Sequence, residues 1–220
     1  MTSSQPAKDP ERIALCIPSS DTWKAQTAFS MVCLGIRSAF AGIVPILIND
    51  RGGDAAENRN LMVRRGRAEG AAWFLFVDAD MTFPADALVR LRAWDVDVVG
   101  ADYRMRSHPF KRIGLSPEGK RLAADLLDTG LVERSVIGLG LVLVRAAVFD
   151  RLPAPWFART WIPQHATADN PHGFSTDDSY FFHYCHHHGF KVWCDLGVTR
   201  EVAHLGELAV PWQLRGQPKE

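Results

Sequence analysis

Two aspartates at the end of a buried strand are the residues best suited to chemistry in this sequence. Residues 73–77 are five consecutive large apolar residues, which is typical of a strand buried on both faces. Asp78 and Asp80 follow directly, one residue apart. Neighbouring carboxylates at a strand end are costly unless a positive group lies beside them, and the usual group is a divalent cation that carries a phosphate. The spacing therefore favours metal-dependent chemistry on a phosphate-bearing substrate.

The elements that position these aspartates alternate along the first half of the chain. Strands are expected at 12–18, 44–49, 73–77 and 96–101, and helices at 23–40, 55–70 and 84–94. The first helix is predicted from the apolar residues Phe29, Val32, Cys33, Ile36 and Phe40. Such alternation predicts a mostly parallel sheet with helices on both faces. Ligands bind such sheets at the carboxyl ends of the strands, where the two aspartates lie.

The second half of the chain is less regular. Residues 137–144 are apolar and β-like, and residues 149–173 form a long segment rich in Pro and Trp, typical of a functional loop. Asp177 and Asp178 precede an expected aromatic helix at 179–188. Short strands are expected at 191–195 and 198–203.

Composition limits the classes of protein to which this chain can belong. Its 220 residues suit one domain, and 25 basic residues balance 25 acidic ones, which disfavours general nucleic-acid binding. The sequence contains no run of 18 apolar residues, so we expect no helix that spans a membrane. The first residues are polar and lack the apolar segment of a secretory signal, so we expect a cytoplasmic protein. We expect a domain at 12–206 between a disordered tail, 1–11, and a C-terminal tail, 207–220.

Several motifs occur together in a fixed order. They are Ile17-Pro18-Ser19, Arg59-Asn60, Val77-Asp78-Ala79-Asp80, Ile137-Gly138-Leu139-Gly140, Leu143-Val144-Arg145, Asp177-Asp178-Ser179-Tyr180-Phe181, Gly189-Phe190-Lys191-Val192-Trp193 and His204-Leu205-Gly206. With these motifs, residues 12–206 resemble a GT-A fold glycosyltransferase of the family-2 type, close to its compact phage and bacterial members. The resemblance implies a three-layer α/β/α fold, the nucleotide-diphospho-sugar transferase fold, with a mostly parallel central sheet.

The resemblance also implies an activity, which is metal-dependent transfer of a sugar from a nucleotide diphosphate donor to an acceptor hydroxyl. It implies that Asp80 and His204 bind Mn²⁺ or Mg²⁺, and that Asp78 lies near the metal or the ribose. A bound cation would stabilise the negative charge that develops on the leaving diphosphate. The expected enzyme is a hexosyltransferase whose acceptor, a glycan, lipid-linked sugar, protein or small molecule, is unknown.

The same resemblance assigns roles to further residues. Asp178 matches the catalytic base, which would make the reaction inverting, and Asp177 stands where the family usually has a glutamate that binds the acceptor. Arg59 matches an arginine that holds the nucleotide. Asp21 and Asp50 follow the first two strands, where the family contacts the base and the ribose. Retention of the anomeric configuration stays open.

Alternative functions were weighed against the transferase. A zinc site is one, because a group of His and Cys residues lies near the C-terminus: His183, Cys185, His186, His187, His188, Cys194 and His204. A nucleotidyltransferase would need a glycine-rich loop after the first strand, and that segment has no glycine. A non-catalytic relative that binds a nucleotide sugar or a sugar is the remaining alternative.

Overall fold

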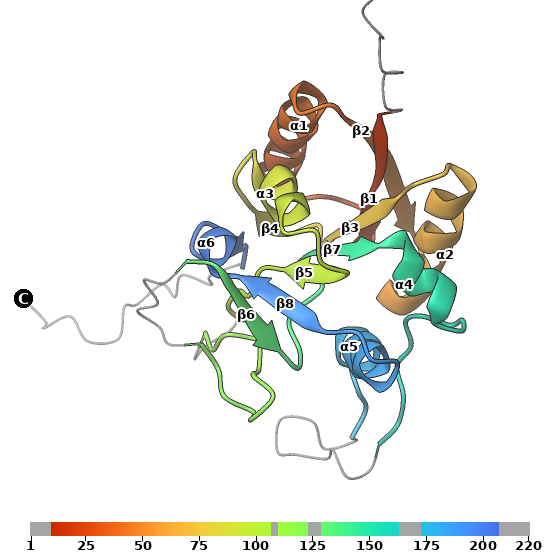
Figure 1. The fold of residues 1–220 in the computed structure, drawn as a ribbon, viewed down its shortest axis with the longest axis vertical. Helices are drawn as coiled ribbons and strands as arrows, with labels where there is room; N and C mark the ends of the chain where they lie inside the picture. Colours follow the sequence, from red (N-terminus) through yellow and green to blue (C-terminus); the bar gives the residue numbers. More distant parts are fainter. Residues whose placement is uncertain (1–9, 107–109, 123–128, 163–172, 207–220) are drawn as a thin grey trace, which may run out of the picture.

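The computed structural model describes residues 10–106, 110–122, 129–162 and 173–206 (Figure 1). The expected terminal tails fall outside these ranges, except that the first strand already includes Glu11. The strands are β1 (Glu11–Ser19), β2 (Ile43–Arg51), β3 (Trp73–Val77), β4 (Met81–Thr82), β5 (Val98–Gly100), β6 (Leu131–Arg134), β7 (Leu141–Arg145), β8 (Val192–Asp195) and β9 (Ala203–His204). The helices are α1 (Ala25–Phe40), α2 (Ala55–Ala68), α3 (Ala87–Ala93), α4 (Ala146–Arg151), α5 (Asp177–His187) and α6 (Leu196–Thr199).

The central sheet has seven strands in the order β2-β1-β3-β7-β5-β8-β6. The pairs β2–β1, β1–β3 and β5–β8 are parallel, whereas β7 is antiparallel to both of its neighbours and β6 is antiparallel to β8. Five strands therefore point the same way, and the predicted α/β fold with a mostly parallel sheet is confirmed. A separate ribbon of β4 and β9 places Met81 opposite His204.

Helices cover both faces of the sheet and form a three-layer arrangement, as Figure 1 shows. Strand β3 supplies both cores because its successive side chains point to opposite faces. Leu75 packs with residues of α1 and α3, including Leu34 and Leu88. On the other face, Phe74 packs with residues of α2, α4 and α5, among them Phe149. The predicted burial of this strand on both faces is correct, since all five of its residues are buried.

Helix α1 forms where the sequence predicts it, but its apolar stripe lies on the solvent side. The residues that α1 buries are largely small or polar: Thr27, Ser30, Met31, Leu34 and Ser38. The stripe that predicts the helix, formed by Phe29, Val32, Ile36 and Phe40, is exposed. Periodicity therefore identified the helix correctly, and the packing of the fold decided which side is buried.

One predicted strand is wrong. Residues 198–203 were expected to be extended, but the structure has the short helix α6 at Leu196–Thr199 and only then β9. Asp195 explains the difference, because its side chain caps α6 by accepting a hydrogen bond of 2.8 Å from the Val198 amide. Of the helices in the described ranges, none combines the length and hydrophobicity that a membrane crossing requires.

Candidate active site

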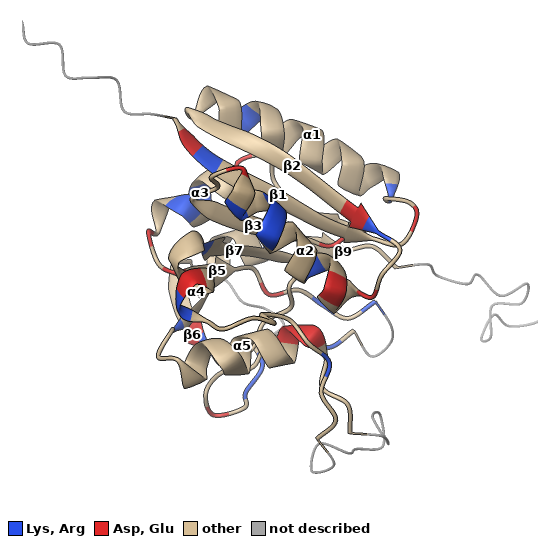
Figure 2. Cartoon of the chain, turned by 90° about the vertical axis from the view of Figure 1, so that its right-hand side faces the viewer, with Lys and Arg blue, Asp and Glu red and all other residues tan. Residues whose placement is uncertain are grey.

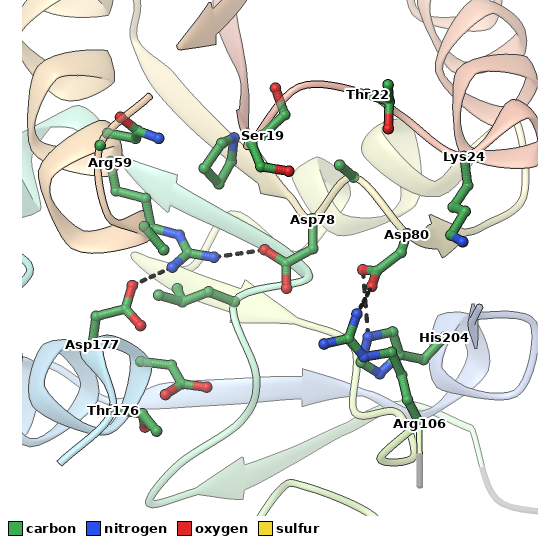
Figure 3. Close-up of a pocket in the computed structure, with 18 residues that line it drawn as sticks. Ser19, Thr22, Lys24, Arg59, Asp78, Asp80, Arg106, Thr176, Asp177 and His204 are labelled. Carbon is green, nitrogen blue, oxygen red and sulfur yellow. Dashed lines mark hydrogen bonds and ion pairs between the residues drawn. The ribbon is translucent and has the colours of Figure 1, made fainter. Parts of the chain in front are cut away.

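A cavity of about 630 Å³ opens where the motifs converge, beyond the carboxyl ends of β1 and β3. Its volume lies within the range of ligand pockets, about 300–1,000 Å³. The lining residues come from loops after strands and from the first turns of α2 and α5: Pro18, Ser19, Ser20, Thr22, Lys24, Gly53, Ala55, Asn58, Arg59, Asp78, Ala79, Asp80, Arg106, Leu139, Thr176, Asp177, Asp178 and His204. The fold thus brings six of the expected motifs to one place (Figure 3).

Asp80 and His204 are in contact, because the ribbon of β4 and β9 brings the C-terminal histidine to the aspartates. His204 Nδ1 lies 3.0 Å from the Arg104 carbonyl oxygen, so it must carry a proton and donate it. His204 Nε2 then faces Asp80 Oδ1 at 3.4 Å. Two atoms that both accept hydrogen bonds thus face each other, an arrangement suited to holding a bound cation or a proton between them.

The second hydrogen bond of His204 is of the kind that metal-binding histidines make. A histidine that binds a metal commonly donates its other N–H to a backbone carbonyl, which fixes the ring and its tautomer, as Arg104 does here for His204. Carboxylate oxygen and imidazole nitrogen suit Mn²⁺ or Mg²⁺, which take their remaining ligands from phosphate and water. The donor set of Asp80 and His204 therefore fits the expected ion.

Asp78, the third expected ligand, is engaged elsewhere. Its Oδ1 accepts a hydrogen bond of 2.6 Å from Arg59 Nη2. Within the described ranges, no group of three or more His, Cys, Asp or Glu side chains is arranged to hold a metal ion. This finding applies both to the expected set of Asp78, Asp80 and His204 and to the zinc alternative.

Arg59 connects two segments that are far apart in the sequence. Its side chain is buried, and it donates to Asp78 at the end of β3 and to Asp177 at the start of α5 (Figure 3). Helix α2 can place it there because Asp54 caps the helix, accepting from the Glu57 amide at 2.9 Å. Both guanidinium amino groups thus bind protein carboxylates, and Arg59 holds the start of α5 to the end of β3 while it also lines the cavity.

The two aspartates at the start of α5 have different surroundings. Asp177 is neutralised by Arg59, whereas the Asp178 carboxylate accepts a hydrogen bond of 2.9 Å from the Ser179 amide. Burial raises the pKa of Asp178, and the neighbouring charge of Asp177 adds to the rise. Asp178 is therefore a carboxylate with increased basicity on the wall of the cavity.

Two cations lie on the cavity wall near Asp80. Arg106 Nη1 is 2.5 Å from Asp80 Oδ2, although the Arg106 side chain is 60% exposed. Lys24 lies on the opposite side of Asp80 from Arg106, at the start of α1 (Figure 3). Burial opposes ionisation of Asp80, but His204 and Arg106 together lower its pKa. A negatively charged ligand would meet positive charge on both sides of Asp80.

Tyr103 supports the site from below, and sequence reasoning missed it. Its buried ring packs edge-on against His204 with 5.2 Å between centroids, and its hydroxyl accepts a 2.9 Å hydrogen bond from the Gly140 amide. A Cβ at Gly138 would overlap that hydroxyl, and one at Gly140 would lie 2.6 Å from it. The available signal in the sequence was the Gly-x-Gly spacing, because both glycines leave room for the Tyr103 hydroxyl.

Two expected donor-binding residues do not line the cavity. Asp50 lies 3.3 Å from Arg65 in an ion pair at the end of β2. Asp21 is exposed, and its neighbours Ser20 and Thr22 face the cavity instead. Lys24 was missed because no motif surrounds it; the turn between β1 and α1 alone brings it to the site.

Comparisons with known proteins show which fold this chain shares. No protein-family model and no curated protein matches the sequence. Among solved structures, A197 from STIV has a TM-score of 0.55 at 13% identity and covers 94% of this chain and 100% of its own. A mutant of the Drosophila β-1,4-galactosyltransferase 7 with manganese, UDP-Gal and xylobiose has a TM-score of 0.52 at 14% identity, covering 90% of this chain and 71% of its own. This likeness shows the fold alone, which is of the GT-A, nucleotide-sugar transferase type.

Proposed function

We propose that this protein is a metal-dependent glycosyltransferase that moves a sugar from a nucleotide diphosphate to an acceptor hydroxyl. The proposal rests on one observation, which is that a candidate metal site and a candidate base lie on two walls of the same cavity. On one side the Asp80 carboxylate faces His204 Nε2 at 3.4 Å, an arrangement suited to a bound cation, and on another wall lies Asp178, a half-buried carboxylate whose pKa is raised. The fold is shared with a galactosyltransferase solved with manganese and UDP-Gal, which agrees with this assignment.

Asp80 and His204 would hold Mn²⁺ or Mg²⁺ together with oxygens of the donor diphosphate. When bound, the cation would supply charge stabilisation to the departing nucleoside diphosphate. Arg106 pairs with the same carboxylate, and its exposed side chain is free of packing that would prevent it from turning toward a phosphate. Lys24 offers a second positive charge, so the protein itself contributes cations to diphosphate binding.

Asp178 would act as the general base. The acceptor hydroxyl loses its proton to the Asp178 carboxylate as its oxygen attacks the anomeric carbon and the bond to the diphosphate breaks. One displacement with one base inverts the anomeric centre. Asp177 and Asp78 then serve as the anchors of Arg59, which holds α5 against the end of β3.

The proposal is tested by thermal unfolding with UDP, GDP, CDP and dTDP, each with and without Mn²⁺. A ligand that binds only the folded state at 100 times its Kd adds about 2.7 kcal/mol of stability. For a domain of this size we expect the midpoint to rise by about 5–10 °C with one nucleotide, and only when metal is present.

Asp80→Asn should abolish that rise, whereas Asp150→Asn, the same substitution on the surface of α4, should preserve it. If no nucleotide raises the midpoint with or without Mn²⁺, the donor site is refuted. Release of nucleoside diphosphate from the matching nucleotide sugar then separates an enzyme from a binding protein, which would show the stabilisation without turnover.

A further inference from the structure

Half of the large hydrophobic side chains that are exposed among the described residues belong to one helix and the neighbouring edge strand. Helix α1 and the edge strand β2 together expose six of them: Phe29, Val32, Ile36, Phe40, Val44 and Leu47. The helix and the strand lie side by side along the edge of the sheet (Figure 2). This surface is distinct from the cavity, since none of these six side chains lines it. We call the outer side of α1 with Leu47 the α1 face.

The α1 face is apolar where a solvent-exposed helix should be polar. Phe29 is 71% exposed, Val32 60%, Ile36 55% and Phe40 82%. These four residues follow helical spacing and lie opposite the side on which α1 buries Leu34 and its neighbours. An ordinary surface helix has polar residues on its solvent side and apolar residues on its buried side. The α1 face therefore has the composition of a surface that another molecule or segment covers.

The size of the α1 face matches what a dimer needs. With typical side-chain areas, the four residues of α1 and Leu47 expose about 600 Å² of apolar surface. Monomeric proteins seldom leave a contiguous apolar patch of this size uncovered. Two copies of the face would bury about 1,200 Å², the lower bound of stable protein interfaces.

The charges on and beside this face favour a second copy over a membrane or a nucleic acid. Within α1, Arg37 is the single charged residue, so the helix appears almost entirely uncoloured in Figure 2. A helix that lies on an anionic membrane carries several Lys or Arg residues on its polar face. A nearly uncharged surface, in contrast, meets its own copy without repulsion.

The free edge of β2 is a weaker site for pairing than the helix. Pro45 lies in the middle of β2, opposite Ile13 of β1, and it has no N–H to donate to an added strand. Extension of the sheet across β2 would therefore be interrupted at its centre. Helix packing through α1 avoids this obstacle.

We propose that the protein forms a two-fold symmetric dimer in which α1 packs antiparallel against α1 of the partner subunit. The stripe is self-complementary, because in this arrangement Phe29 lies opposite Phe40 of the partner subunit and Val32 lies opposite Ile36 of the partner subunit. Closed two-fold symmetry is the commonest form of homo-oligomer.

Analytical ultracentrifugation of the full chain over a concentration series tests the dimer. We expect the unaltered chain to sediment as a dimer of 24.5 kDa subunits, and Ile36→Glu to sediment as a monomer. Leu61→Glu, the same kind of change on the exposed side of α2, should remain dimeric. An unaltered chain that stays monomeric at every concentration overturns the proposal and leaves the α1 face to another occupant, such as residues 207–220.

A cross-linking experiment identifies the face without relying on a destabilised variant. All four cysteines lie in described ranges, and Cys33 on α1 is the one that is not buried. In the proposed packing the two Cys33 side chains lie about 10 Å apart across the helix pair. A short bismaleimide should link the dimer through Cys33, and Cys33→Ser should abolish the link. A dimer that cannot be linked through Cys33 uses another face, which also refutes the proposal.

Discussion

Two adjacent carboxylates, Asp177 and Asp178, have different surroundings and therefore different chemical properties. Asp177 forms an ion pair with the guanidinium of Arg59. Asp178, one residue later, has its pKa raised, mainly by burial and further by the neighbouring charge of Asp177. Environments that separate the properties of neighbouring titratable groups are typical of acid–base sites. At the level of single residues, this asymmetry is the reason to assign the base to Asp178.

Substitution of Asp178 by Asn should remove catalysis and spare donor binding. The amide keeps the size of the side chain and its bond from the Ser179 amide but cannot accept a proton. We expect hydrolysis of the donor nucleotide sugar, with water as acceptor, to fall by about 100-fold or more. The stabilisation by nucleotide and Mn²⁺ should remain. Full hydrolytic activity of Asp178→Asn would exclude this residue as the base.

The pH dependence of the unaltered enzyme follows from the same group. A base works only when it is deprotonated, and the pKa of Asp178 is raised. The rate should therefore fall as the pH drops through that raised pKa, at a higher pH than an ordinary aspartate would produce. An acid limb at the pH of an unperturbed aspartate, about 3.9, would contradict the assignment.

At the level of the helix, two glycines, Gly66 in the last turn of α2 and Gly35 within α1, have different surroundings. Gly66 lies where α2 packs against the sheet. A Cβ added there would overlap the Phe74 ring and lie 3.0 Å from the Ala14 Cβ. Gly35 of α1 has no atom within 4 Å of the Cβ position. Close packing of α2 on β1 and β3 depends on the first glycine, and this packing places Arg59 at the cavity.

Alanine at these two positions should change stability in opposite directions. Both substitutions gain helix propensity, which is worth about 0.5–1 kcal/mol, because glycine loses more backbone entropy. Gly66→Ala must also displace packed atoms, at a cost of about 1–3 kcal/mol. Urea unfolding at one protein concentration should show Gly35→Ala neutral or stabilised and Gly66→Ala destabilised. Equal effects would mean that α2 does not pack as closely as the structure indicates.

At the level of the whole molecule, the cavity and the α1 face are separate surfaces. The cavity lies at the carboxyl ends of the strands, whereas the α1 face runs along the outside of the molecule beside the sheet edge (Figure 2). Since the side chains of Phe29, Val32, Ile36 and Phe40 do not line the cavity, dimer formation is not required to complete it.

Separation of the two surfaces predicts independent outcomes. The Ile36→Glu chain, as a monomer, should show the same rise in unfolding midpoint with nucleotide and Mn²⁺ as the unaltered chain. Conversely, Asp80→Asn should lose the rise and remain a dimer in sedimentation. If either substitution removes both properties while the chain stays folded, the two surfaces are coupled and their separation is refuted.

The sequence by itself determined most of the elements and led to the chemistry that we propose. The apolar run of β3 identified a strand buried on both faces, and the alternation along residues 12–101 gave the α/β sheet. These features are local, since hydrophobic periodicity and short-range spacing depend only on residues that are close together in the sequence. The positions of Asp78 and Asp80 at the end of that strand followed for the same reason.

Only the tertiary structure decided which side chains face one another. The resemblance implied that His204 and Asp80 meet, but the sequence could not show that the ribbon of β4 and β9 joins them, or that Arg59 pairs with Asp177, 118 positions away. Nor could periodicity tell which side of α1 is buried, because periodicity identifies an apolar stripe but not the surface on which the helix packs. Contacts between distant segments depend on how whole elements pack, and that information is not contained in any one stretch of the chain.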